Sequence, residues 1–284
     1  MKIAEFYNDI TEQLTKAQIE HPALNAEVLI SFYFGWNRTQ FYLNQQHELT
    51  EQECAEIKRL IERRITREPL QYITGVQNFY GRDFAVRPGV LIPRPETELL
   101  VETLISEAEL VWGDASLQVV DIGTGSGAIA ITLALEKSAW QVSAGDLSST
   151  ALEQAIANNA NLSANVKFVQ GDLFVPFGSD VNQFDIIVSN PPYIVRQTIA
   201  ELAAEVRLYE PHSALDGGVD GLDYYRRLLT EGLPFLKRPG LIALEIGYNQ
   251  AETLTELIEK SGVTELKIIA DFQEIPRIII AKYL

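Results

Sequence analysis

The segment Asp121-Ile122-Gly123-Thr124-Gly125-Ser126-Gly127-Ala128 joins a short apolar strand, predicted over residues 117–121, to an amphipathic helix predicted over residues 128–137. Glycines at this junction let the chain turn sharply and leave its backbone open to close approach by a ligand. Free N–H groups at the start of the helix face the same space. The segment therefore predicts the first strand, turn and helix of an α/β sheet, with a ligand site above the turn.

Two kinds of nucleotide-containing cofactor fit this turn. Read as Gly123-x-Gly125-x-x-Ala128, it satisfies the dinucleotide-binding fingerprint. Read as Asp121-x-Gly123-x-Gly125-x-Gly127, it resembles the first motif of S-adenosylmethionine-dependent methyltransferases. Asp146 ends the next predicted strand, where its carboxylate can accept hydrogen bonds from a ribose diol. The third predicted strand ends in Gly171-Asp172-Leu173-Phe174, where Asp172 and Leu173 would reach the adenine of either cofactor, so the turn alone leaves the choice open.

The chain divides into a helical N-terminal domain, a short linker and a larger α/β domain. Apolar residues recur every three or four positions over residues 1–75, which predicts four or five helices. Turn signals among aromatic and β-branched residues at 76–95 predict a β-hairpin linker. Residues 76–284, linker included, are predicted to form a parallel sheet with helices on both faces. The strands are predicted at 117–121, 141–146, 166–172, 184–190, 241–246, 266–270 and 277–282, and the helices include 95–110, 128–137 and 151–158.

Composition and charge exclude several classes of function. The 284 residues carry a formal charge of −16, which opposes the phosphate attraction that drives non-specific nucleic-acid binding. With one cysteine, Cys54, and three histidines, we predict neither a disulfide nor a metal site. No apolar run approaches the roughly 18 residues that span a bilayer, and the first residues lack a signal-peptide core. We therefore expect a cytoplasmic protein that does not enter membranes.

The tetrapeptide Asn190-Pro191-Pro192-Tyr193 follows the fourth predicted strand of the sheet. In a doubly wound sheet the carboxyl ends of the first and fourth strands flank the same crevice, so this tetrapeptide is expected beside the glycine turn. The two prolines make the backbone rigid and supply no N–H groups, which leaves a rim of hydrogen-bond acceptors. Such a rim would hold the NH₂ group of an amide or aromatic amine through the Asn190 side-chain oxygen and the Pro191 carbonyl. We predict methylation of a planar nitrogen by positioning, with the Tyr193 ring packed against the flat substrate group.

Several motifs together resemble the HemK family of peptide chain release factor glutamine methyltransferases. They are Ile92-Pro93-Arg94-Pro95-Glu96-Thr97-Glu98, the turn from Asp121 to Gly127, Ser189-Asn190-Pro191-Pro192-Tyr193, Tyr209-Glu210-Pro211, Ala214-Leu215-Asp216-Gly217-Gly218 and Asp220-Gly221-Leu222. The resemblance extends over nearly the whole chain. It implies a class I, Rossmann-like methyltransferase sheet with a small N-terminal all-α domain joined by a β-hairpin linker.

The resemblance also implies an activity and a set of site residues. The reaction is N(5)-methylation of the glutamine in the Gly-Gly-Gln motif of release factors, with S-adenosylmethionine as methyl donor, in support of translation termination. The methionine part of S-adenosylmethionine would be held by Gly123, Thr124, Gly125, Ser126 and Gly127. Asp146 would bind the ribose, and Asp172 and Leu173 would contact the adenine edge. Residues 190–193 would hold the glutamine, with Asn190 beside the cofactor as well. The helical domain would clamp the release factor. The pattern of the basic helix from Lys58 to Arg67, which alternates with Glu56, Glu62 and Glu68, favours a solvated face, and the alternative is a docking face for this partner.

The alternative is an amino-group methyltransferase that acts on adenine in DNA or RNA with the same tetrapeptide. Residues 1–75 hold 8 basic and 11 acidic residues, a net charge of −3, and residues 76–284 hold 15 and 28, a net charge of −13. A catalytic domain at −13 is a poor phosphate binder, because nucleic-acid binding requires several neutralised phosphates. The charge therefore favours a protein substrate, and we expect no stable binding of nucleic acid.

Overall fold

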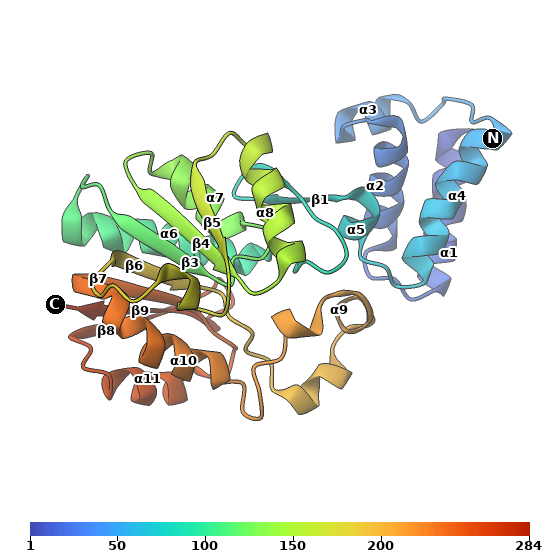
Figure 1. The fold of residues 1–284 in the computed structure, drawn as a ribbon. Coiled ribbons are helices and arrows are strands. Elements are labelled where there is room, and N and C mark those ends of the chain that lie inside the picture. The colour runs from blue at the N-terminus through green and yellow to red at the C-terminus, as the bar shows by residue number, and fades with distance from the viewer. The chain divides into compact units, whose positions relative to one another are not determined.

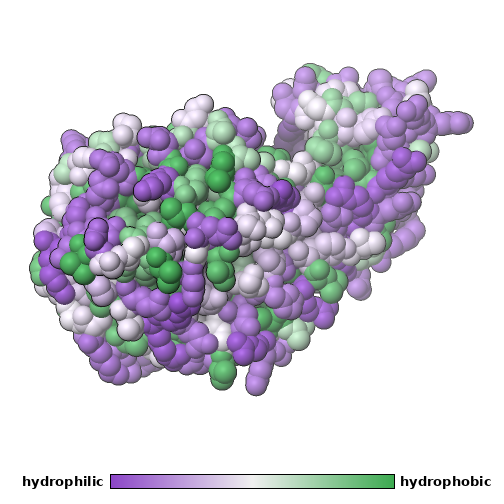
Figure 2. All heavy atoms as spheres, in the orientation of Figure 1, coloured by the Kyte–Doolittle hydropathy of each residue, from purple (hydrophilic) through white to green (hydrophobic).

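The computed structural model describes residues 1–284, which form two compact units (Figure 1). One unit comprises Met1–Val76 and Ala203–Tyr209, and the other comprises Gln77–Leu202 and Glu210–Leu284. The surface drawn in Figure 2 is mostly hydrophilic, with hydrophobic residues in small groups. No helix is long and apolar enough to cross a membrane.

The smaller unit is helical, and its core comes from the apolar positions that the sequence spaces every three or four residues. Ile3, Phe6, Ile10 and Leu14 are buried along its first helix and pack with apolar residues of the second and fourth helices. Thr50 caps the fourth helix by accepting a hydrogen bond from the Glu53 N–H, as a capping box requires. The helices are α1 (Ile3–Lys16), α2 (Pro22–Phe34), α3 (Arg38–Leu43), α4 (Glu51–Ile65), α5 (Leu70–Thr74) and α9 (Ala204–Tyr209).

The assignment of residues 203–209 to the helical unit was not expected from the sequence. Glu205 on α9 accepts hydrogen bonds from Arg64 at 3.0 Å and from Arg67 at 3.4 Å. The Tyr209 hydroxyl donates to the Thr66 carbonyl at 2.8 Å. A segment from the second half of the chain therefore completes the helical unit.

The larger unit contains a hairpin, a seven-stranded sheet and helices on both faces of that sheet. The hairpin consists of β1 (Val76–Phe79), which begins at the boundary between the units, and β2 (Arg82–Ala85). The sheet strands are β3 (Gln118–Ile122), β4 (Gln141–Asp146), β5 (Val166–Gln170), β6 (Phe184–Ser189), β7 (Leu236–Glu245), β8 (Glu265–Ala270) and β9 (Pro276–Tyr283). The α-helices are α6 (Pro95–Trp112), α7 (Ala128–Glu136), α8 (Ser149–Asn161), α10 (Asp223–Gly232) and α11 (Ala251–Glu259). Short 3₁₀ turns are η1 (Val175–Phe177), η2 (Arg196–Glu201), η3 (His212–Ala214) and η4 (Leu233–Phe235).

The strand order is β5-β4-β3-β6-β7-β9-β8, so β3 and β6 lie side by side at the point where the order reverses. This is the topological switch point of a doubly wound sheet, where a crevice opens outside the carboxyl ends of the strands. The Ser189 hydroxyl donates to the Ile122 carbonyl at 2.6 Å and ties the ends of the two strands together. The prediction that the ends of the first and fourth strands lie next to each other is confirmed.

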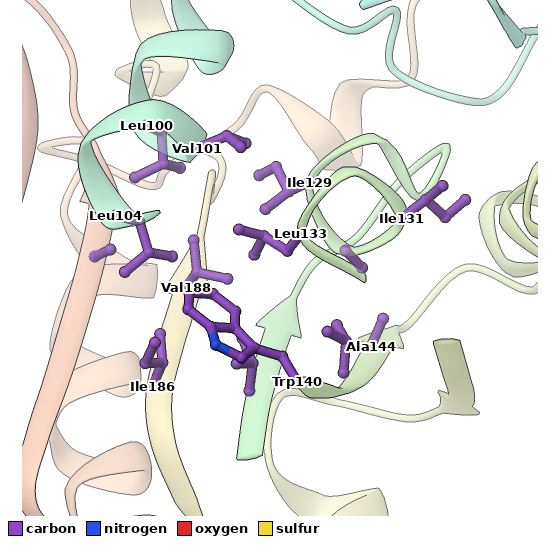
Figure 3. Close-up of a cluster of buried hydrophobic side chains, with 14 of the residues drawn as sticks. Leu100, Val101, Leu104, Ile129, Ile131, Leu133, Trp140, Ala144, Ile186 and Val188 are labelled. Atoms are coloured by element: carbon purple, nitrogen blue, oxygen red, sulfur yellow. The ribbon is translucent and has the colours of Figure 1, made fainter. Parts of the chain in front are cut away.

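Two hydrophobic clusters hold the helices against the sheet. One lies under α6 and α7, where Leu100 and Leu104 face Ile129 and Leu133 above Val188 of β6 (Figure 3). The other lies under α10 and α11 on the opposite face and includes the fully buried Tyr225. Both faces of the central strands are thus covered, which explains their continuous apolar sequence.

The predicted parallel arrangement is confirmed for β3 to β7 and is wrong for the last two strands. β9 pairs antiparallel with both β7 and β8. Only a short loop, residues 271–275, connects β8 to β9, whereas a parallel connection needs a dozen or more residues. β5 and β6 end at Gln170 and Ser189, earlier than predicted, and β7 begins at Leu236 rather than at residue 241.

Candidate active site

A cavity of about 350 Å³ opens at the carboxyl ends of β3, β4 and β6, within the larger unit. Its size falls in the range of small-molecule sites. It brings together all but two of the predicted site residues, along with Arg94, which precedes α6, and Thr97, which lies in the first turn of α6. The predicted residues that line it are Gly123, Thr124, Gly125, Ser126, Asp146, Asp172, Leu173, Asn190, Pro191 and Pro192. Gly127 lies between Ser126 and Ala128, which both line the cavity, and Tyr193 is considered below.

Each glycine of the turn after β3 has a positive φ angle, which favours glycine. Gly123 and Gly125 have φ values of +76° and +57°, and nothing lies within 4 Å of where a Cβ would be. At Gly127 a Cβ would lie 2.7 Å from Cδ1 of Ile131, so the third glycine allows α7 to pack closely. The first two glycines therefore shape the turn and leave its backbone open toward the cavity.

Asp146 at the end of β4 connects two backbone segments of the site. Its carboxylate accepts hydrogen bonds from the Gly125 N–H and the Ser148 N–H, each at 2.8 Å. Burial raises the pKa of the Asp146 carboxyl. The side chain is fixed at the rim of the cavity, and each oxygen retains a lone pair for a further donor.

Asp172 and Leu173 line the cavity after β5. The Asp172 carboxylate accepts two hydrogen bonds from the Arg227 guanidinium, at 3.0 Å and 2.9 Å. Leu173 has a φ of +46°, a left-handed conformation that is rare for a side chain of this kind. Arg227 is a partner of the site that the sequence did not predict, because it comes from α10.

Asn190 lies at the carboxyl end of β6, beside the glycine turn, and its side-chain NH₂ donates to Oγ1 of Thr97 at 3.1 Å. Thr97 donates in turn to Oε2 of Glu245 at 2.6 Å. Glu245 ends β7 and is only 2% exposed. Sequence reasoning missed both residues, although an acidic residue within an apolar strand was a signal at Glu245.

Tyr193 does not line the cavity. Its hydroxyl donates to Oε1 of Glu245 at 3.3 Å, and its ring packs against the hydrophobic cluster under α10 and α11. Burial and the Glu245 charge raise the pKa of the Tyr193 hydroxyl. The structure therefore does not bring this ring to the substrate position that we predicted for it, because the hydroxyl finds its partner on the core side.

The glycines that follow Leu215 explain how the backbone after Asn190 is held. A Cβ on Gly217 would lie 2.8 Å from Cα of Tyr193, and a Cβ on Gly221 would lie 2.5 Å from the Tyr193 carbonyl oxygen. Gln250 donates to the carbonyl oxygens of Tyr193 and Gly221, at 3.0 Å and 3.1 Å. This loop therefore braces the Asn-Pro-Pro-Tyr segment from behind.

Arg94 both lines the cavity and forms an ion pair. Its guanidinium lies 2.5 Å from Oε1 of Glu210, whose other oxygen accepts from the Ile92 N–H at 3.3 Å. The Glu210 side chain is buried, and the pair joins the proline-rich segment before α6 to the loop that begins at Pro211. Arg94 therefore lines the cavity and also fixes the segment before α6.

The basic helix α4 is largely occupied by contacts within the helical unit. Arg64 is buried and bonds Asn25 and Glu205, and Arg67 bonds the carbonyls of Ala17 and Gln18. Arg63 forms two hydrogen bonds with Glu68. Arg64 and Arg67 therefore serve the packing of the unit. Lys58, Arg59 and the ion-paired Arg63 are the exposed basic residues of the predicted docking face.

The buried carboxyl of Asp121 makes the stability of the protein depend on pH. Burial, with a contribution from the Asp146 charge, raises its pKa from 3.8 to about 7, although Thr124 donates a hydrogen bond to it. Between these two values the folded state holds a proton that the unfolded chain has released. The stability that Asp121 contributes is therefore greatest at low pH and falls as the pH rises toward 7.

We expect the Asp121→Asn variant to lose this dependence. Between pH 5 and pH 8 the unfolding free energy of the wild type should fall by about 2–3 kcal/mol more than that of the variant, since one pKa unit corresponds to about 1.4 kcal/mol. Urea denaturation without ligand at four pH values measures the difference. Parallel curves for the two proteins would show that Asp121 is ionised throughout this range.

Known proteins resemble the chain in both sequence and fold. Residues 5–75 match the PrmC N-terminal domain, and residues 95–218 match the methyltransferase small domain. A crystal structure of a methyltransferase from Pyrococcus furiosus is 20% identical, covers 80% of this chain and 97% of its own, and has a TM-score of 0.51. The hMettl16 catalytic domain is 18% identical, with coverage of 78% and 81% and a TM-score of 0.58. At these identities the structural likeness shows the fold alone.

The fold, the cavity and the domain match define a methyltransferase of the Rossmann-like class, which uses S-adenosylmethionine. The release factor glutamine methyltransferase of Koribacter versatilis is 40% identical over 282 residues, which are 99% of each chain. That of Bacillus subtilis is 43% identical over 270 residues, 94% of this chain and 93% of its own. The chain belongs to the release factor glutamine methyltransferase family.

Proposed function

We propose that this protein transfers a methyl group from S-adenosylmethionine to the side-chain amide nitrogen of the glutamine in the Gly-Gly-Gln motif of release factors. The observation that carries the proposal is the position of Asn190, Pro191 and Pro192 on the same cavity as the glycine turn. An acceptor rim next to a cofactor turn suits a planar NH₂ group. Family membership supports the choice of a release factor as the protein that presents this group.

We assign the cofactor to the half of the cavity at β3, β4 and β5. The backbone of Gly123 to Gly127 would hold the methionine part, the Asp146 carboxylate the ribose hydroxyls, and Asp172 with Leu173 the adenine edge. The residues fit the cofactor, because the two open glycines present backbone to the cavity and Asp146 is fixed at its rim. Bound S-adenosylmethionine supplies a sulfonium methyl group that is reactive toward nucleophiles.

We assign the substrate to the half of the cavity at β6. The NH₂ group of Asn190 is bonded to Thr97, so its carbonyl oxygen is the atom left to accept a hydrogen bond from the glutamine amide. The Pro191 carbonyl would accept the second N–H. Two acceptors would orient the nitrogen and raise its electron density, and Tyr193 would act behind them by fixing the segment through Glu245. No base is required before transfer, since the extra proton can leave to water afterwards.

The assignment of Asp146 to the ribose predicts a loss of cofactor binding in the Asp146→Ala variant. The variant lacks the carboxylate acceptor and the bond that steadies Gly125, and charge-assisted hydrogen bonds contribute about 1.5–3 kcal/mol each. We expect the affinity for S-adenosylmethionine to fall by about 10²-fold in titration calorimetry. The exposed Asp114→Ala is the control and should bind like the wild type. Equal affinity in both variants would refute the ribose assignment.

We further propose that the N-terminal helical domain predicted over residues 1–75 takes part in recognising the release factor in the cytoplasm, and that residues 76–284 carry the reaction. The surface available for binding a release factor includes two exposed basic residues, Lys58 and Arg59, and two exposed aromatic or apolar side chains, Tyr42 and Leu43. The net charge of −13 over residues 76–284 does not favour a nucleic-acid substrate.

The experiment that tests the substrate class is methyl transfer from labelled S-adenosylmethionine, offered in parallel to a purified release factor and to duplex DNA. We expect label in the release factor and background in the DNA. Label in the DNA alone would overturn the proposal in favour of an amino-group methyltransferase acting on adenine.

A further inference from the structure

Three polar side chains form a continuous chain of hydrogen bonds behind the substrate half of the cavity. Asn190 donates to Thr97 at 3.1 Å, and Thr97 donates to Glu245 at 2.6 Å. Thr97 is 4% exposed and Glu245 is 2% exposed. Asn190 directly follows β6, Thr97 lies on α6 and Glu245 ends β7, so the tertiary fold brings the three together.

The direction of these hydrogen bonds follows from the carboxylate. An ionised carboxylate has no proton and can only accept, and Glu245 accepts from Thr97 on one oxygen and from Tyr193 on the other. The Thr97 hydroxyl has a single proton, which it gives to Glu245. Its oxygen must therefore accept from Asn190, and only the NH₂ end of the Asn190 amide can provide that donor.

We propose that Glu245 is a positioning residue that sets the orientation of the Asn190 amide through Thr97. The inference rests on the proposed function, in which the Asn190 oxygen receives the N–H of the substrate glutamine. If the Asn190 amide were rotated by 180°, its NH₂ group would face the NH₂ group of the substrate glutamine. The substrate nitrogen would then lose its hydrogen-bond acceptor. The relay makes that orientation costly, because Asn190 would then turn an acceptor toward a threonine oxygen that has no second proton to give.

The position of Glu245 supports a role beyond packing. Burying a carboxylate lowers the stability of the folded state, and an apolar residue at the end of β7 would avoid this loss. Burial raises the pKa of Glu245 to about 7, while the bonds from Thr97 and Tyr193 oppose this shift. Glu96 on α6 raises the pKa further, Arg277 on β9 lowers it, and the Tyr225 hydroxyl of α10 donates to the Glu245 backbone carbonyl. Above a pH of about 7 the ionised form of Glu245 predominates, and this is the form that fixes the direction of the relay.

The test compares Thr97→Val, Thr97→Ser and Glu245→Gln with the wild type. Valine matches threonine in shape and removes the hydroxyl, serine keeps the hydroxyl, and glutamine can donate as well as accept. The measurements are kcat and KM with a release factor, S-adenosylmethionine affinity by calorimetry, and the melting temperature.

We expect kcat of Thr97→Val and of Glu245→Gln to fall by about 10–10²-fold, since a small misplacement of a reacting group has effects of this size. Cofactor affinity should stay within about threefold of the wild type, and Thr97→Ser should keep kcat within about threefold. Wild-type kcat in Thr97→Val would overturn the inference. So would a loss of cofactor affinity that parallels the loss of kcat, because that pattern marks a general structural role. A wild type that is inactive on release factors would overturn the proposed function and the inference with it.

Discussion

Replacement of Asn190 by alanine is expected to reduce kcat for glutamine methylation by about 10²–10³-fold, the size of effect seen when one preorganised hydrogen-bonding group is removed from an active site. The variant lacks the side-chain oxygen that would orient the substrate amide. The cofactor half of the cavity is untouched, so the affinity for S-adenosylmethionine should stay within about threefold. Steady-state kinetics and calorimetry on the same preparation measure the two quantities.

Asn165→Ala is the matched control, because Asn165 is an exposed asparagine that does not line the active-site cavity. It should match the wild type in both measurements. Unchanged turnover in Asn190→Ala would contradict the assignment of the substrate to this half of the cavity. A selective loss of cofactor affinity with normal turnover at saturation would move Asn190 to the cofactor half.

The Gly221→Ala variant is expected to lose both stability and activity. Its Cβ would lie 2.5 Å from the Tyr193 carbonyl oxygen and 2.6 Å from Nε2 of Gln250, at a φ of +77°. Overpacking and left-handed strain together should cost about 2–4 kcal/mol. Because the displaced atoms belong to the segment that carries Asn190, kcat should fall by about 10²-fold.

The control is Gly262→Ala, which introduces the same backbone strain as Gly221→Ala without the steric contacts. Gly262 has a φ of +85° with nothing within 4 Å of the added Cβ, so this variant should lose only about 1 kcal/mol and no activity. Urea denaturation and steady-state kinetics on both variants give the comparison. If Gly221→Ala behaves like Gly262→Ala, the loop does not brace the Asn-Pro-Pro-Tyr segment.

The sequence allowed the central fold to be predicted because its signals are local. The glycine turn, the strand that ends at Asp146 and the tetrapeptide after β6 each follow from a few consecutive residues. Doubly wound topology then places the ends of β3 and β6 together. The pairing of β9 with β7 and β8 departed from the prediction, although the short connection after β8 was a local signal for it.

The residues that support Asn190 and Tyr193 from behind the cavity lining are held by contacts between positions far apart in the sequence. Thr97 and Glu245 lie 148 positions apart, and Gln250 lies 57 positions after the Tyr193 carbonyl that it bonds. Whether a side chain points into the cavity or into the core depends on such contacts. The contact between Tyr193 and Glu245 cannot be read from the sequence around Tyr193, so its ring was predicted on the substrate side. Likewise, nothing local to residues 203–209 indicates that they complete the helical unit.

The central claim is that the methyl group is placed on a glutamine amide nitrogen. The most direct test is incubation of a purified release factor with this protein and S-adenosylmethionine, followed by fragmentation mass spectrometry of the peptide that contains Gly-Gly-Gln. We expect a single added methyl group on the glutamine side chain of that motif, absent when the enzyme is omitted. A methyl group on any other residue, or none in the release factor while DNA is methylated, would contradict the account.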